Sequence, residues 1–196
     1  MVTYEDLVTL FEDADRCFRH DDIRLFEDRV SERTLCGALM LHLHEEMRKH
    51  GELYKGFHAD VEYNRNRNTI KKIFQKKEDN DDGIIVNINC DLLVHGRGLT
   101  LEQENLIAIE MKKDYAQEVD KNRDRYRLEA LTSDPNEWRD RGLFPYDGVE
   151  MEDIRYNYVL GVYYEVSYSD GMILIEYYQN GEKQREYKVR WREQVD

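Results

Sequence analysis

Residues 106–109 read Leu-Ile-Ala-Ile, and an extended strand with this sequence has hydrophobic side chains on both of its faces. Such a strand is stable only inside a sheet that is covered on both sides. Helical patterns occur as well, because Leu35, Leu39 and Leu43 recur at helical spacing and residues 114–131 look helical. The sequence therefore predicts an α/β (α+β) fold with a covered sheet.

Two further strands are predicted ahead of this run. Alternation of apolar and polar residues with a period of two places them at residues 57–63 and 84–94. One face of the second strand is expected to be apolar and to contain Ile88, Cys90, Leu92 and Val94. Asp91 then lies on the polar face. Residues 64–77, between the two strands, have no strand character.

Helix caps divide the N-terminal half of the chain. Thr3 and Asp6 have the spacing of a capping box ahead of an amphipathic helix, which lies in an N-terminal helical extension at residues 1–30. Ser31 is the expected N-cap of the helix that begins the core. We assign this core to residues 31–132.

Hairpin signals dominate the C-terminal part. Asp-Gly at 170–171 and Asn-Gly at 180–181 are typical two-residue turns, and they separate segments rich in Tyr, Val and Ile. They predict a C-terminal antiparallel β-meander within residues 154–196, whose tyrosines pack in a core. Because neither repeats nor flexible linkers interrupt the chain, we expect a single domain over residues 1–196.

Composition restricts the class of function and the compartment. With 42 acidic and 29 basic residues among 196, the formal charge of −13 argues against a protein that coats nucleic acid with a basic surface. The three cysteines have neither the spacing of a zinc site nor the even number of a disulfide framework, which favours a reducing compartment. No apolar run approaches the roughly 20 residues that cross a bilayer, and no signal peptide is evident. We expect a cytoplasmic protein that does not interact with a membrane.

The acid-x-Lys triplet after the doubly apolar run is the candidate site. With 42 acidic residues among 196, chance produces roughly two such triplets, so only their context is informative. Glu110 and Lys112 are two residues apart on a strand, hence on one face, where a buried sheet meets solvent. Glu186 and Lys188 form the other triplet, and their polar surroundings in a terminal hairpin indicate a solvated face.

Asp91 is the expected partner of this triplet. If the two strands pair, its carboxylate converges with that of Glu110 and with the backbone carbonyl of Met111 on one hard cation, because Mg²⁺ (or Mn²⁺) prefers oxygen ligands. Lys112, beside them, could hold negative charge that develops on phosphorus or orient an attacking water. As a base, it would need a pKa lowered from its usual value of about 10.4, so charge stabilisation is the favoured role.

Segments 91–98 and 105–113 together resemble the signature of the PD-(D/E)xK nuclease superfamily, the restriction-endonuclease-like fold, and more narrowly that of small uncharacterised bacterial members. Residues 60–65 resemble the first strand of that group, although Cys90 stands where the family usually has proline. The resemblance implies a mixed-sheet core with the order α-β-β-β-α-β. It also implies metal-dependent hydrolysis of phosphodiester bonds, with a glutamate of the first helix, here Glu32, joining the catalytic group.

Other interpretations of these residues remain open. Glu32 could instead interact only with the helix macrodipole, as first-turn carboxylates do. His42 and His44 point about 200° apart on a helix, which favours structural or surface roles over zinc binding. His95 shares the face of Asp91, and an ordinary hydrogen-bonded histidine is its favoured interpretation.

A local basic strip opposes the acidity of the whole chain. Residues 65–77 contain six basic residues and no acidic residue. The residues proposed to bind phosphate are Arg65, Arg67, Lys71 and Lys72. A solvated surface segment is the alternative.

Two hypotheses of function follow. The first is a Mg²⁺-dependent, nuclease-like phosphodiesterase, a hydrolase whose substrate is DNA or RNA. The second is a catalytically inactive nuclease-like module that binds a protein partner, in phage defence or mobile-element biology. Both are compatible with a homo-oligomer.

Overall fold

The computed structural model describes residues 1–62, 72–77, 80–87, 90–98, 103–137, 143–145 and 157–191. The α-helices are α1 (Tyr4–Asp21), α2 (Ile23–Glu27), α3 (Glu32–Lys49) and α4 (Glu118–Thr132). Two short 3-10 helices are η1 (Gly51–Tyr54) and η2 (Pro135–Glu137).

A six-stranded sheet forms the centre of the molecule. Its strands, in spatial order, are β1 (His58–Val61), β4 (Leu92–His95), β5 (Asn105–Lys113), β7 (Leu160–Val166), β8 (Met172–Gln179) and β9 (Glu182–Arg190). Neighbouring strands are antiparallel except β5 and β7, which run parallel. A parallel pair needs a crossover connection, and here the connection contains α4. The predicted mixed sheet is confirmed.

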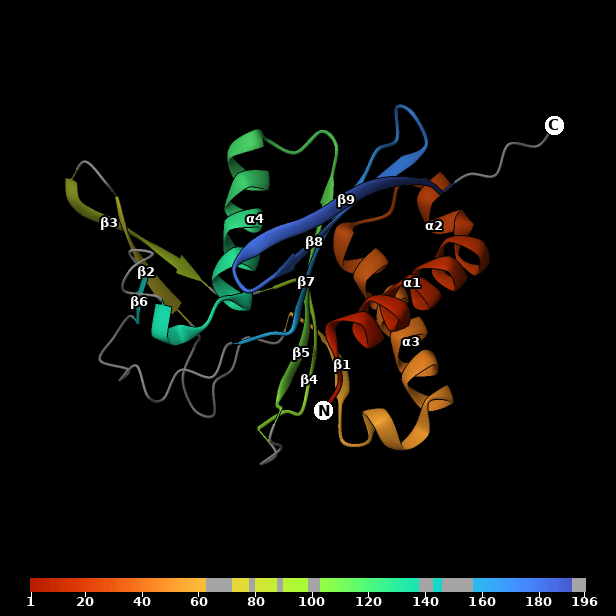
Figure 1. Ribbon diagram of the computed structural model, residues 1–196. Coiled ribbons are helices and arrows are strands. Elements are labelled where there is room, and N and C mark those ends of the chain that lie inside the picture. Colours follow the sequence, from red (N-terminus) through yellow and green to blue (C-terminus); the bar gives the residue numbers. More distant parts are fainter. Residues whose placement is uncertain are drawn as a thin grey trace.

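Helices cover both faces of this sheet. In Figure 1, α1, α2 and α3 lie on one side of the sheet and α4 lies on the other. Strand β5 contributes to both interfaces, because Ile107 and Ile109 belong to the cluster under α1 and α3, whereas Ala108 packs with Leu128 and Leu131 of α4. The prediction that residues 106–109 form a strand covered on both faces is confirmed.

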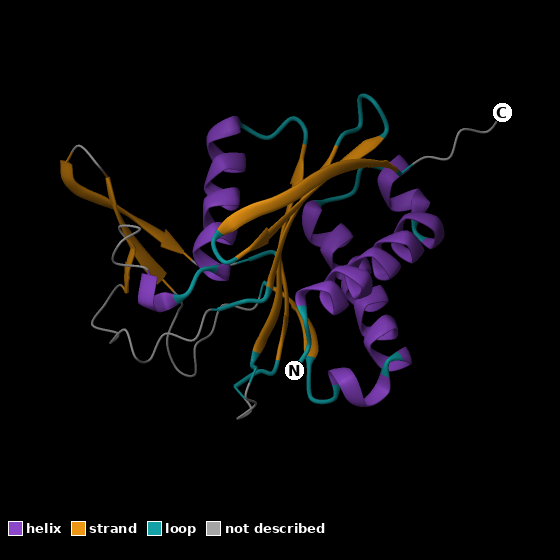
Figure 2. Cartoon of the chain, in the orientation of Figure 1, coloured by secondary structure: helices purple, strands orange, loops and turns teal. Residues whose placement is uncertain are grey.

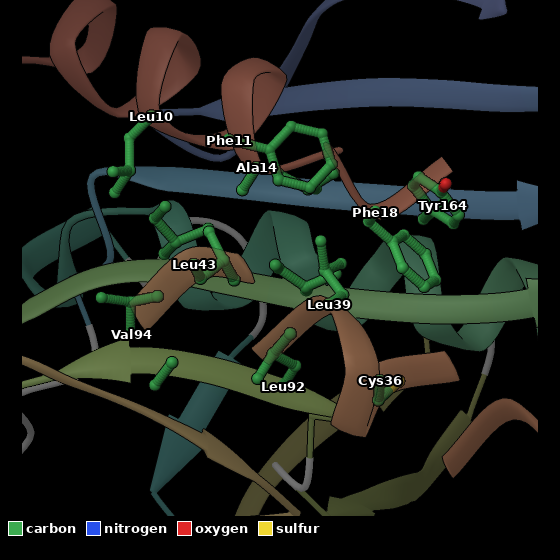
Figure 3. Close-up of a cluster of buried hydrophobic side chains, with 14 of the residues drawn as sticks. Leu10, Phe11, Ala14, Phe18, Cys36, Leu39, Leu43, Leu92, Val94 and Tyr164 are labelled. Carbon is green, nitrogen blue, oxygen red and sulfur yellow. The ribbon is translucent and has the colours of Figure 1, made fainter. Parts of the chain in front are cut away.

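The larger hydrophobic cluster joins the predicted leucine stripe of α3 to the sheet. Figure 3 shows Leu39 and Leu43 close to Leu92 and Val94 of β4, with side chains of α1 above them. Phe11 of α1 meets Tyr164 of β7 edge to face, with 6.3 Å between the ring centroids.

Both predicted helix caps are present. The Thr3 hydroxyl accepts a hydrogen bond from the Asp6 amide (3.2 Å), and the Asp6 carboxylate accepts one from the Thr3 amide (2.9 Å). The Ser31 hydroxyl accepts from the Thr34 amide at the start of α3 (3.2 Å). These bonds satisfy amide donors that have no partner within the helix.

A second sheet corrects two predictions. Its three strands, in spatial order, are β3 (Asn80–Asn87), β2 (Lys72–Lys77) and β6 (Leu143–Pro145), and Figure 2 shows it on the α4 side of the molecule. The prediction that residues 64–77 lack strand character is wrong for β2, which is paired on both sides. The predicted strand 84–94 is likewise wrong, because its two ends belong to different sheets. The two apolar residues of β2, Ile73 and Phe74, are adjacent rather than alternating, so a search for a period of two does not detect this strand.

Cys90 lies on the other side of the sheet from the position predicted for it. It packs with Leu93 in the cluster under α4, whereas Leu92 and Val94 belong to the cluster under α1 and α3. The alternation fails because β4 begins only at Leu92, and Asp91 before it forms a bend.

The C-terminal meander is confirmed. Strands β7, β8 and β9 are consecutive antiparallel neighbours, and both predicted turns separate them. Four of its tyrosines are buried: Tyr163, Tyr164, Tyr177 and Tyr178. Among the described helices, none combines the length and the apolar character required to span a membrane.

Candidate functional site

Asp91 occupies the point where β4 begins beside β5. One oxygen of its carboxylate accepts a hydrogen bond from the Met111 amide (Oδ2 to N, 2.8 Å), and its backbone carbonyl accepts one from the Glu62 amide (3.0 Å). Because the ladder between the two strands ends at Leu92 and Ile109, the Asp91 side chain takes the place of a backbone acceptor for β5. Asp91 is thereby held next to Glu110.

Glu110 points from β5 toward α4 and is 1% exposed. Its carboxylate forms an ion pair with Arg127 of α4. Arg127 also lies 3.1 Å from Asp124 (Nη1 to Oδ1), one helical turn earlier. A cation supplied by the helix therefore already compensates the deepest carboxylate of the site.

Lys112 lies on the same face of β5, two residues further on. Its ammonium is 2.7 Å from Asp124 Oδ2 and 3.9 Å from Glu32 Oε2. The Lys112 side chain is 16% exposed, so it lies at the boundary between the packed interface and solvent.

Glu32 reaches this group from the first turn of α3. Its Oε1 accepts a hydrogen bond from the Lys113 amide (3.0 Å) at the end of β5. The structure therefore brings together the four residues predicted for the catalytic site, Glu32, Asp91, Glu110 and Lys112, at the end of β5.

Burial dominates the electrostatics of the carboxyl groups. It raises the pKa of Glu110 well above its usual value, although the charge of Arg127 opposes the rise. Burial also raises the pKa of Asp91, against hydrogen bonding from the Met111 amide and the charge of Lys112. The pKa of Glu32 rises for the same reason, and the charge of Asp91 adds to the effect of burial. Burial therefore makes negative charge at this site costly, and the charges of Arg127 and Lys112 offset part of that cost.

Lys112 shows the opposite balance. Burial lowers its pKa, but the hydrogen bond and the charge of Asp124 outweigh burial, so the pKa of the ammonium rises above its usual value. Lys112 is consequently a cation at neutral pH. This favours a role in holding negative charge over a role as a base.

The donor chemistry of the site suits a hard divalent cation. The carboxyl groups of Glu32, Asp91, Glu110 and Asp124 outnumber the cations Lys112 and Arg127, and oxygen donors are those that Mg²⁺ prefers. Within the described part of the chain, however, no three or more His, Cys, Asp or Glu side chains form a group arranged to hold a metal ion. The ion pair with Arg127 would compete with a metal ion for the carboxylate of Glu110.

Sequence reasoning missed Asp124 and Arg127. They lie three residues apart on α4, on the face that Leu128 and Leu131 press against the sheet. A helical projection of residues 114–131 would have shown two charged residues adjoining an apolar stripe. Charged side chains are rarely buried without a partner, so that position is the signal for their role.

The predicted phosphate-binding strip does not form part of the described site. Arg65, Arg67 and Lys71 fall outside the described residues, and Lys72 is the first residue of β2 in the separate sheet. The strip therefore remains a prediction.

The histidines have structural partners. The His95 ring is 3.1 Å from the Asp60 carboxylate, and the His42 ring is 2.7 Å from the carboxylate of Asp22. The His44 ring lies 3.1 Å from the backbone carbonyl of Ala59. Hydrogen bonding, the favoured interpretation of His95, is confirmed.

Comparisons of the chain with models of protein families, with curated proteins and with solved structures found no match. The functional argument therefore depends on the residues of this chain and their geometry.

Proposed function

We propose that the protein is a Mg²⁺-dependent phosphodiesterase of nuclease type, which hydrolyses phosphodiester bonds of DNA or RNA. The observation that carries this proposal is the meeting of Asp91, Glu110 and Lys112 at the end of β5, with Glu32 beside them. Acidic residues with one adjacent lysine supply both the cation ligands and the positive charge that phosphoryl transfer requires.

Each residue has a distinct role in this proposal. Asp91 and Glu110, with the Met111 carbonyl, would hold Mg²⁺ or Mn²⁺, which polarises the phosphate when bound. Lys112 stabilises negative charge at the phosphate, because Asp124 keeps its ammonium protonated and oriented. Glu32 orients the end of β5 through the Lys113 amide and adds a carboxylate.

The order of elements supports the narrower assignment to the PD-(D/E)xK superfamily. Along the chain, α3, β1, β4, β5, α4 and β7 follow the expected α-β-β-β-α-β order, with the β2–β3 pair inserted between β1 and β4. Glu110 and Lys112 lie on the third strand of this series, Asp91 directly precedes the second strand, and Glu32 lies on the first helix. We propose a restriction-endonuclease-like core on these grounds.

A cleavage assay tests the proposal. Purified protein is incubated with single- and double-stranded DNA and RNA in Mg²⁺, in Mn²⁺ or in EDTA. We expect cleavage that requires the metal and falls about 100-fold or more in Asp91→Asn and in Lys112→Met. The asparagine retains an oxygen that can accept from the Met111 amide, so it separates loss of charge from loss of structure.

The second acid-x-Lys triplet provides a matched control. Lys188 is exposed on β9, and Lys188→Met is expected to leave cleavage unchanged. Full activity in Lys112→Met, or equal losses in the two lysine variants, would contradict the assignment.

The ion pairs favour a second candidate function. Arg127 already neutralises Glu110, and Asp124 already engages Lys112, so the group can persist as a structural network. This observation supports the alternative of an inactive nuclease-like module that binds a protein partner.

Calorimetry separates the two candidates. If the protein is a phosphodiesterase, the wild-type protein should bind Mn²⁺ and the Glu110→Gln variant should not. A wild-type protein that takes up no Mn²⁺ while it cleaves no nucleic acid would favour the binding module.

A further inference from the structure

A pocket opens beside the candidate site, between α2 and the end of the meander. It has a volume of about 400 Å³, within the range of roughly 300–1,000 Å³ that is typical of small-ligand sites. The lining residues are Arg24, Phe26, Glu27, Arg29, Tyr168 and Trp191. In Figure 1, α2 lies beside the C-terminal end of β9, which Trp191 follows.

One wall of the pocket is aromatic and fixed in place. Phe26 and Trp191 are stacked, with 5.8 Å between ring centroids and 15° between ring planes. Tyr168 meets Trp191 edge to face at 6.1 Å, and the Trp191 indole N–H donates to the Ser167 carbonyl (2.9 Å). Phe26 is fully buried and Trp191 is 7% exposed, so these two rings hold the half-buried Tyr168 in place, and Tyr168 is the ring that reaches the pocket. Unpaired nucleobases stack on such fixed aromatic rings.

Arg29 supplies a cation at this wall. Its guanidinium carbon lies 5.4 Å from the centroid of the Tyr168 ring, and no ion pair joins it to a carboxylate among the described residues. Arg24, by contrast, lies 3.3 Å from Glu27 (Nη1 to Oε2). Arg29 also has a φ of 51°, in the left-handed region that residues with a side chain adopt uncommonly. A guanidinium in this setting is available to an external phosphate.

Lys113 connects the pocket to the candidate site. Its ammonium donates to the Arg29 carbonyl (3.3 Å), and its amide donates to Glu32 (3.0 Å). The same ammonium is 5.9 Å from the centroid of Tyr168. The pocket and the candidate site therefore meet at Lys113. Two cations, Arg29 and Lys113, lie near the ring of Tyr168.

From this arrangement we propose that the pocket binds one nucleotide of a single-stranded nucleic acid, next to the phosphate held at Lys112. Arg29 pairs with the backbone phosphate, and the base lies against the Tyr168 side of the aromatic wall. A base reaches such a wall only when it is unpaired, which selects single strands. The assignment builds on the proposed phosphodiesterase and names its substrate class.

Fluorescence of Trp191 tests this assignment. The chain has two tryptophans, so Trp138→Phe leaves Trp191 as the only indole. In EDTA, where binding is measured without cleavage, an oligothymidylate is expected to quench this emission saturably. Arg29→Gln should weaken binding roughly tenfold and reduce the slope of log affinity against log salt by about 0.7. An abasic oligonucleotide of equal length should bind more weakly than oligothymidylate.

Arg48→Gln is the matched control, because Arg48 is an exposed arginine that pairs with Glu45 (3.0 Å) on the distant part of α3. Binding unchanged by Arg29→Gln, or equal binding of the abasic strand, would overturn the pocket assignment even if the protein cleaves nucleic acid. Arg29-dependent binding by a protein that cleaves nothing in any metal would uphold the pocket and contradict the proposed function. Arg29→Lys, which keeps the charge, should retain part of the affinity, and equal melting temperatures show that the variants fold.

Discussion

Arg127 compensates the most buried carboxylate of the candidate site. Its side chain is 12% exposed, and it contacts both Glu110 and Asp124. An ion pair in such a place contributes little net stability relative to apolar residues, but removal of one partner leaves the other charge buried and unpaired. Without Arg127, the buried carboxylate of Glu110 would need a different cation, such as a metal ion, to compensate its charge.

Arg127→Met is expected to destabilise the protein by about 3–5 kcal/mol, because Glu110 loses its partner. Urea unfolding at neutral pH measures this change. Addition of Mn²⁺ should restore part of the loss, since a metal ion can take over the role of the guanidinium. The double variant Arg127→Met/Glu110→Gln should recover stability without metal. A double variant as unstable as the single one would show that Arg127 acts through packing.

A second ion pair gives a prediction of pH dependence. The hydrogen bond from Arg97 lowers the pKa of Asp60 below its usual value of 3.8, against the effect of burial. The pKa of Asp60 is lower in the folded protein than in the unfolded chain. The ion pair therefore stabilises the fold fully at a pH above the pKa of the unfolded chain, and this stabilisation disappears as the pH falls through the pKa of the folded protein. Asp60→Asn should therefore cost roughly 0.5–1 kcal/mol at pH 6, given the partly exposed Arg97, and almost nothing at pH 2.

Asp13→Asn is the control for this measurement, since it removes an exposed ion pair with Arg16. Its effect on the free energy of unfolding should be smaller at pH 6. An Asp60→Asn penalty that stays constant between pH 6 and pH 2 would contradict the electrostatic explanation.

Among the elements, α4 depends on a close approach to β7. A Cβ atom at Gly161 would lie 3.0 Å from Tyr178 Cβ, 3.1 Å from Thr132 Cγ2 and 3.4 Å from Leu128 Cβ. Gly161→Ala should therefore destabilise the protein by about 1–3 kcal/mol, as measured by thermal or urea unfolding. Because α4 carries Asp124, which holds the Lys112 ammonium, the same substitution should also slow cleavage.

Gly37 on α3 is the matched control, because among the described residues no atom beyond its own helical turn lies within 4 Å of the Cβ that an alanine would add. Gly37→Ala is expected to stabilise the helix by up to about 1 kcal/mol. Equal losses of stability in the two variants would contradict the packing argument for α4.

Local sequence patterns correctly predicted those helices, strands and turns that are specified by residues close together in the chain. The capping box at Thr3 and Asp6, the doubly apolar β5 and the hairpin turns of the meander all depend on residues near one another. The same patterns misplaced Cys90, because alternation does not show that Asp91 bends the chain before β4. They also missed the role of Arg127, since the register of α4 against β5 is set by packing between distant segments.

At the scale of the whole molecule, the position of a strand in the sheet should determine its protection. Strand β5 lies between two neighbours and is buried on both faces, whereas β9 is an edge strand with a largely exposed pattern of residues. Amide hydrogen exchange should therefore be slowest in β5 and much faster in β9. Similar exchange rates in both strands would indicate that the sheet opens only as a whole.

Strand β7 belongs to two parts of the architecture at once. It is the parallel neighbour of β5 and also the first strand of the meander, so the C-terminal strands cannot be removed without exposing β5. An apolar strand with a bare row of amides and carbonyls is a template for self-association. A chain that ends before β7 should consequently form insoluble aggregates. During synthesis, chaperones would have to hold the incomplete chain until roughly its last fifth has emerged.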